Sequence, residues 1–304
     1  MRHSRSEQFE AALAAPPSAH RRWTEDDLDP NAASALARRA LTLRAAWRPQ
    51  VPDRAVFLVE RSRGRHVLDI GCVAHDVARM SSPAWLHGRL AAVAASCVGV
   101  DILQEGVDEM LRLGHRAIVH DLSSGVGPLA DEAPFDVIVA GELVEHVGSN
   151  DMLFAVAAQL LAHDGELIIT TPNPWSPSRV RAGRLGHVWE NVDHVVFAFP
   201  SGVAELAERH GLVLAEARTT AEQPQHSVRS RLKAVRRRLR GQQWMNVGFR
   251  TVGEPAVVRI SDAWRSRVPT RVWRPYRAQS GETSIYVVCR PASRSPAVAD
   301  SASE

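Results

Sequence analysis

The sequence predicts an α/β fold in which helices cover both faces of a doubly wound, mainly parallel sheet. Short apolar runs alternate with segments of helical periodicity along most of the chain, as in successive β–α units. Three of these runs end in an aspartate, at the end of the strand where such sheets bind ligands. The chain has 304 residues, of which 45% are hydrophobic and 23% are charged, so it can bury one large core.

Residues 1–60 are interpreted as a helical N-terminal segment. An Ala/Leu/Arg pattern predicts a helix over residues 31–47, which Pro49 ends. A second helix is predicted from Asp53 to about residue 63. We expect these helices to cap the sheet or to cover a ligand bound at its edge.

Residues 61–222 are predicted to form the core of the fold. Strands are expected at residues 67–70, 98–101, 117–121, 135–141, 166–171 and 212–217. Helices are expected at residues 83–96, 103–113 and 201–210, the last capped by Ser201, and another from the fourth strand to about Ala162. A loop rich in Pro, Arg and Gly is expected over residues 172–192.

The last strand is predicted within residues 283–291, so residues 223–282 form an insertion before it, and residues 292–304 read as a disordered tail. Eight Arg or Lys and no Asp or Glu lie between residues 223 and 253, although the whole chain has a formal charge of only +3. Residues 226–240 have apolar residues at helical spacing among these arginines. Such a basic amphipathic helix suits an anionic membrane or lipid-linked substrate, a nucleic acid, or a solvated lid over the site.

Composition also bears on the compartment. No apolar run approaches the roughly 20 residues that span a bilayer, and the N-terminus lacks the pattern of a secretory signal. The three cysteines, Cys72, Cys97 and Cys289, are few and scattered, which favours a reducing cytoplasm. A cytoplasmic protein is therefore expected, with residues 226–240 as a possible contact to the inner face of the membrane.

The strand-end acids are Asp69, Asp101 and Asp121. Asp69 and Gly71 follow the first strand and are the natural first contacts for a cofactor. An acid after the second strand can accept both hydroxyls of a ribose, and one after the third strand can accept from an adenine amino group. A single such acid is more often a helix cap, but three in one register favour an adenosine ligand. A dinucleotide enzyme is disfavoured because Gly-x-Gly-x-x-Gly is absent after the first strand.

These motifs together resemble the class I S-adenosylmethionine-dependent methyltransferases. The residues that carry the resemblance are Val67-Leu68-Asp69-Ile70-Gly71-Cys72, Val98-Gly99-Val100-Asp101, His120-Asp121, the run from Phe135 to Glu142, and Thr171-Pro172-Asn173-Pro174. The resemblance implies a Rossmann-like, seven-stranded sheet with the last strand antiparallel, and S-adenosylmethionine as cofactor. It implies cofactor contacts from Gly71, Asp101 and Asp121, and the other candidate contacts are Asp69, Cys72, His75, Ile102, Leu122 and Gly141.

The first loop departs from the pattern of the family. The family has three glycines at alternate positions, but here Val73 and His75 replace the second and third. Side chains at these positions would block a close approach of the backbone to the cofactor. His75 could donate to the cofactor carboxylate or stand in solvent, and a non-catalytic cofactor-binding protein is a further alternative.

A second cluster, Glu142-Leu-Val-Glu145-His146, follows the fourth strand. We expect both glutamates on one face of a helical turn, where they hold a divalent cation such as Mg²⁺ or simply favour a helix N-terminus. The pattern is similar to those of ubiquinone-biosynthesis O-methyltransferases and of small-RNA 3′-terminal ribose methyltransferases. This resemblance implies a metal held by Glu142, Glu145, His146 and, in a looser match of Asp193-His194, by His194.

The sequence therefore predicts a methyltransferase that acts on an oxygen. A small-molecule, quinone-like, glycan or lipid-linked acceptor is favoured over an RNA ribose. Without a metal, the candidate catalytic residues are Glu145, His146 and His194, since an imidazole titrates near neutral pH and can serve as a general base.

Overall fold

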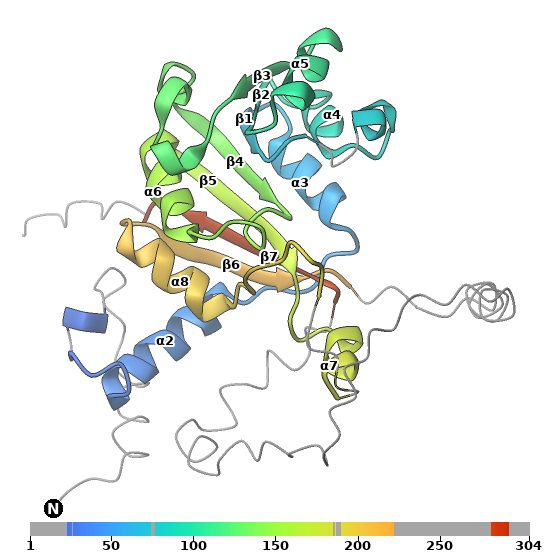
Figure 1. The fold of residues 1–304 in the computed structure, drawn as a ribbon. Helices are drawn as coiled ribbons and strands as arrows, with labels where there is room; N and C mark the ends of the chain where they lie inside the picture. Colours follow the sequence, from blue (N-terminus) through green and yellow to red (C-terminus); the bar gives the residue numbers. More distant parts are fainter. Residues whose placement is uncertain are drawn as a thin grey trace, which may run out of the picture.

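The computed structural model describes residues 23–25, 27–73, 77–184, 186, 190–221 and 281–291. Within them the chain forms a seven-stranded sheet of order β3-β2-β1-β4-β5-β7-β6 (Figure 1). The strands are β1 (His66–Ile70), β2 (Ser96–Asp101), β3 (Arg116–Val119), β4 (Phe135–Gly141), β5 (Leu161–Pro172), β6 (Val213–Thr219) and β7 (Thr283–Cys289). β7 pairs antiparallel with both β5 and β6, while the pairs from β3 to β5 are parallel. The predicted doubly wound sheet with an antiparallel last strand is confirmed.

Helices lie on both faces of the sheet (Figure 1). They are α2 (Ala33–Ala46), α3 (Arg54–Ser62), α4 (Leu86–Ala91), α5 (Gln104–Arg112), α6 (Asn150–Leu160), α7 (Pro177–Arg184) and α8 (Pro200–Arg209). α2, α6 and α8 pack on one face through the largest apolar cluster, and α3 and α4 pack on the other. No helix of the described residues is long and apolar enough to cross a membrane.

Each central strand divides its side chains between these two faces. In β1, Leu68 and Ile70 enter the cluster beneath α6 and α8, whereas Val67 enters the cluster beneath α3 and α4. Successive side chains of a strand point to opposite faces, so Asp69 lies on the side of Val67. This alternation places the carboxylate of Asp69 under α4 and not in the loop beyond the strand.

Two predicted helices are shorter in the structure. The helix expected at residues 83–96 covers only Leu86–Ala91, because the chain then returns to the sheet and Ser96 pairs with His66. The helix expected directly after the fourth strand begins only at Asn150. Residues 142–149 are turns instead, and Glu142 has a φ of 54°, which no right-handed helix contains.

The segment after β5 also differs from the prediction. The expected loop over residues 172–192 contains α7, whose start Ser176-Pro177 is a helix-start signal that the sequence reading overlooked. Ser201 does not cap α8. Phe199 is the capping residue and makes no side-chain cap, because its ring carries no hydrogen-bond acceptor. Pro200 is the first helical residue, so α8 begins one residue earlier than predicted. The basic insertion, residues 226–240 included, lies outside the described residues.

Candidate active site

The carboxyl ends of β1, β2 and β4 lie side by side at one edge of the sheet. Asp69 of β1 is in register with Gly99 of β2 and with Val139 of β4, and all three strands are parallel. The loops that follow them therefore meet at one place, the usual location of a ligand site in an open α/β sheet.

The loop after β1 is held closely by its neighbours. Gly71 has a φ of +72°, and a Cβ on it would lie 3.0 Å from the side chain of Leu143, in the loop after β4. Its N–H donates to the carbonyl of Val100 at 2.9 Å. The Cys72 carbonyl accepts a hydrogen bond from the indole of Trp85 at 3.0 Å. Both the conformation and the close contact explain why a glycine is required here.

Two side chains at this strand end are buried rather than open to a ligand. Asp69 is 2% exposed, and its Oδ2 lies 3.0 Å from Nδ1 of His87, a buried residue of α4. Cys72 is also buried, and this burial raises the pKa of its thiol far above the ordinary value. Asp69 is therefore placed to support the loop through His87, a partner that the sequence reading did not single out. In the sequence, the only indication of this role was that His87 follows Leu86 on the inward face of a helix.

The unusual residue of the first loop, Val73, is accommodated by a glycine on α5. A Cβ on Gly106 would lie 2.3 Å from Cγ1 of Val73, so the valine fills the space that a side chain on α5 would otherwise take. The N–H of Val73 donates to Oδ2 of Asp101 at 3.0 Å. The loop thus keeps a defined conformation without the second glycine. His75 lies outside the described residues.

The ends of β2 and β3 offer what an adenosine needs. Asp101 lies at the end of β2, and its second oxygen accepts a hydrogen bond from the N–H of Leu103 at 3.1 Å. Asp121 is exposed beyond β3, where it caps the turn that begins at Leu122, and the N–H of Ser123 lowers the pKa of its carboxyl. Ile102 is 65% exposed between these ends. Each carboxylate keeps lone pairs for a hydroxyl or an amine, and Ile102 adds an apolar surface.

The two glutamates after β4 do not share one face of a helical turn, contrary to the expectation, because residues 142–149 form turns and no helix. Glu142 donates its N–H to the carbonyl of Thr170 at 2.8 Å, and its carboxylate lies 3.8 Å from the guanidinium of Arg54. Its positive φ turns the chain, so the spacing of three no longer aligns it with Glu145. Gly141, expected to contact the cofactor, ends β4 immediately before this turn.

Glu145 is almost fully buried. It is 1% exposed, its Oε2 accepts a hydrogen bond from the Thr171 hydroxyl at 3.0 Å, and its Oε1 has no hydrogen-bond partner among the described residues. Burial disfavours the charged form and raises the pKa of this carboxyl to about 7. A carboxyl group that titrates near neutral pH, and whose second oxygen is free to accept a hydrogen bond, is suited to proton transfer.

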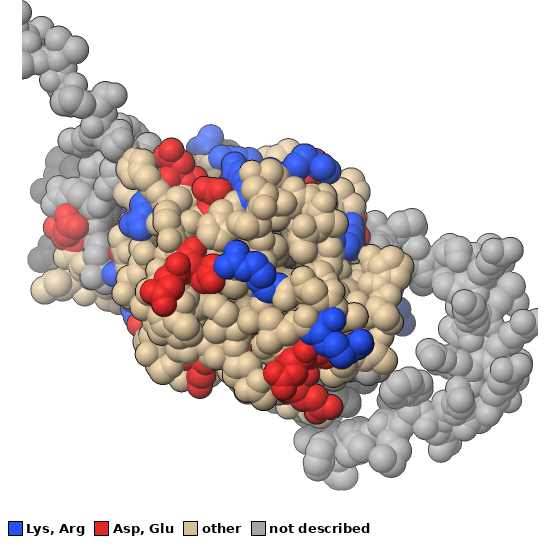
Figure 2. All heavy atoms as spheres, turned by 90° about the horizontal axis from the view of Figure 1, so that it is seen from above, with Lys and Arg blue, Asp and Glu red and all other residues tan. Residues whose placement is uncertain are grey.

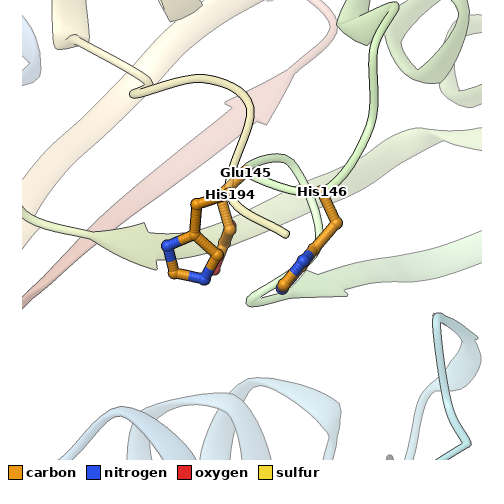
Figure 3. Close-up of side chains that lie close together, drawn as sticks. All are labelled: Glu145, His146 and His194. Atoms are coloured by element: carbon orange, nitrogen blue, oxygen red, sulfur yellow. The ribbon is translucent and has the colours of Figure 1, made fainter. Parts of the chain in front are cut away.

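Two histidines lie beside Glu145 (Figure 3). The imidazole rings of His146 and His194 are 4.8 Å apart and nearly perpendicular. Nδ1 of His146 lies 3.1 Å from Oδ2 of Asp193, whereas Nδ1 of His194 is buried and has no hydrogen-bond partner within the described ranges. The N–H of Val195 donates to the carbonyl of Glu145 at 2.8 Å, which fixes the two loops to each other.

Three of the four predicted metal ligands thus come together. Glu145, His146 and His194 each offer one ligand atom, and these atoms all lie within 4.8 Å of one another. Glu142 does not belong to this group. His194 is brought in from the segment between α7 and α8, so no local spacing could have paired it with Glu145.

Comparisons with known proteins agree with this architecture. Residues 39–217, more than half of the chain, match a family model described as a methyltransferase domain. Among solved structures, an S-adenosylmethionine-dependent methyltransferase from Archaeoglobus fulgidus is 15% identical, with 78% of this chain and 91% of that chain covered and a TM-score of 0.45. An O-methyltransferase of a polyketide synthase from Brevibacillus brevis, in complex with S-adenosyl-L-homocysteine, is also 15% identical, with 78% and 71% covered and a TM-score of 0.44.

No curated protein sequence matches the chain. The family model covers more than half of the chain, and the sheet has the seven strands and the antiparallel last strand that the resemblance implied. The chain belongs to the methyltransferase-domain family and is a class I S-adenosylmethionine-dependent methyltransferase.

Proposed function

We propose that the chain transfers the methyl group of S-adenosylmethionine to an oxygen of a small acceptor, a phenol, a quinone-like compound or a glycan or lipid-linked hydroxyl. One observation carries the proposal, namely the buried and unpartnered Oε1 of Glu145 beside two imidazoles. A hydroxyl must lose its proton to become a good nucleophile, and this group of side chains can take that proton.

The proposed reaction is an in-line displacement. The acceptor oxygen forms a bond to the methyl carbon while the bond from that carbon to sulfur breaks and S-adenosylhomocysteine leaves. The proton of the acceptor passes to Glu145 or to one of the imidazoles of His146 and His194. Since the pKa of Glu145 is about 7, this carboxylate is available as a base at neutral pH. The remaining contribution of the protein is to align the acceptor with the methyl group.

A divalent cation is a second way to activate the acceptor at the same place. Glu145, His146 and His194 would hold it, and the bound cation would lower the pKa of an acceptor hydroxyl. Two imidazoles and one carboxylate suit ions that accept nitrogen ligands, such as Mn²⁺, Fe²⁺ or Zn²⁺, better than Mg²⁺, which prefers oxygen. The contact of His146 with Asp193 resembles the carboxylate partner that orients many metal-binding histidines.

An RNA acceptor has less support from the described residues. On the face shown in Figure 2, acidic and basic side chains lie next to each other and form no continuous basic area among the described residues. Binding of RNA phosphates calls for clustered positive charge. The arginines of residues 226–240 lie outside the described residues, so contacts of that segment with RNA or with an anionic membrane stay predictions.

The proposal is tested by a transfer screen with tritiated S-adenosylmethionine across fractionated small molecules and a panel of phenols. A methyl ether keeps its label in mild base, whereas a methyl ester releases it as methanol. Glu145→Gln is expected to lower kcat by about 100-fold or more, with unchanged binding of S-adenosylhomocysteine by calorimetry. EDTA treatment, followed by addition of Mn²⁺ or Mg²⁺, tests the metal.

His194→Gln should reduce kcat in the same assay, and the matched control is His163→Gln, because the side chain of His163 is 72% exposed and distant from the site. A nitrogen-linked product would contradict O-methylation, and a base-labile methyl ester would contradict a hydroxyl as the acceptor. Full turnover in both Glu145→Gln and His194→Gln would remove the proposed base.

A further inference from the structure

A cavity of about 210 Å³ lies between α6, β5, residues 196–199 and α8. Its walls are mostly apolar and include Val144, Phe154, Ile169, Phe197, Val203 and Leu206. An apolar cavity of about 150 Å³ already binds benzene, so this one has room for a substituted ring or a short alkyl chain. The cavity opens to solvent beside the exposed rings of Phe197 and Phe199, so a ligand can enter it.

One polar atom in the wall lacks a partner. Asn150, the first residue of α6, lines the cavity and donates its Nδ2 hydrogen to the carbonyl of Val144 at 3.1 Å. Its Oδ1 is buried and accepts no hydrogen bond from the part of the chain that the structure describes. Leaving such an acceptor unpaired costs free energy, so a ligand that carries one donor beside an apolar body would complement the cavity.

The cavity adjoins the group of Glu145, His146 and His194 through both loops. Val144, in its wall, directly precedes Glu145, and Val196, also in its wall, is two residues beyond His194. The hydrogen bond from Val195 to the carbonyl of Glu145 holds these two stretches together. Glu145, His146 and His194 are not part of the lining, but the two loops that carry them border the cavity.

We infer that this cavity binds the apolar part of the methyl acceptor, so that the acceptor is an amphiphile with a hydroxyl next to an aryl or alkyl group. The inference rests on the proposed function for the position of the hydroxyl, but the cavity itself can be tested by binding alone. Phe197 and Phe199 line the cavity and are also exposed, so their rings add apolar surface where the cavity meets solvent.

Gly202 offers a way to fill the cavity without removing a contact. It lines the cavity one helical turn before Leu206, and a Cβ built on it meets nothing within 4 Å. Gly202→Leu adds volume there and raises the helix propensity of α8, so the variant should fold. Gly183→Leu is the matched control, since Gly183 is also helical with open space around its Cβ but lies on α7, away from the cavity.

The experiment measures binding of phenol, 4-ethylphenol and 4-butylphenol by calorimetry to the full-length chain saturated with S-adenosylhomocysteine. Affinity should rise about fourfold for each added methylene in the unaltered protein and in Gly183→Leu. In Gly202→Leu this rise should disappear, while the affinity for S-adenosylhomocysteine stays the same.

Affinity that does not change along the series in the unaltered protein would overturn the inference. The inference would also be overturned if the affinity of Gly202→Leu rose with each added methylene as much as that of the unaltered protein, because the apolar group would then bind elsewhere. Methyl transfer is assayed separately on the same samples. Transfer without the chain-length effect would overturn only this inference, whereas the chain-length effect without transfer to oxygen would count against the proposed function alone.

Discussion

Replacing Glu145 with glutamine should stabilise the protein while it impairs the reaction. Glu145 is buried with only one oxygen hydrogen-bonded, and this burial raises its pKa from the usual 4.5 to about 7. Between these two pH values the folded chain holds a proton that the unfolded chain has lost. The free energy of unfolding therefore falls as the pH rises through this window.

The size of the effect follows from the gap of about 2.5 pH units between the two pKa values. Each unit corresponds to about 1.4 kcal/mol, so Glu145 lowers the stability by about 3 kcal/mol at pH 8 relative to pH 4.5. Glutamine has nearly the same shape and no charge to bury. We compare the free energy of unfolding of Glu145→Gln with that of the unaltered chain. The difference in favour of the variant should grow by about 3 kcal/mol from pH 4.5 to pH 8, which corresponds to about 5–10 °C in Tm.

Urea unfolding followed by circular dichroism at pH 5, 6, 7 and 8 measures this difference directly. Glu60→Gln serves as the control, because the Glu60 side chain is 64% exposed on α3 and should show no such trend. A stability difference between Glu145→Gln and the unaltered chain that stays constant from pH 5 to pH 8 would refute the reasoning. It would mean that Glu145 is ionised in the folded protein at pH 5 as it is in the unfolded chain.

Three further predictions concern the cofactor side of the site. Gly106→Ala should weaken binding of S-adenosylhomocysteine about tenfold in calorimetry, because the new Cβ would lie 2.3 Å from Val73, and Val73→Gly in the same chain should restore it. Asp101→Asn should weaken that binding about 10- to 100-fold, since an amide cannot accept both backbone N–H groups that the carboxylate now accepts; equal affinity would contradict this. His87→Phe should lower the free energy of unfolding by about 3–5 kcal/mol in urea titrations at neutral pH, because the buried Asp69 would lose its partner.

Much of the fold was predictable from local sequence. The apolar runs of the central strands are buried on both faces, and their bounds in the structure differ from the predicted ones by a few residues. The strand-end acids Asp101 and Asp121 lie where parallel strands place them. Ends of helices were less predictable, as at Ser201 and Ala162, because caps and returning strands compete with helical propensity.

By itself the sequence determined the class of the protein: the alternation of strands and helices, the register of the strand-end acids and the motifs of a methyltransferase. These features depend on residues close together in the chain, because the periodicity of apolar residues indicates which face of a strand or helix is buried. Only the tertiary structure decided how the site is completed. It left Glu142 outside the group of Glu145, His146 and His194, placed His87 against Asp69 and set Gly106 opposite Val73. Each of these pairings joins side chains through packing between different segments, and no spacing along the chain encodes that contact.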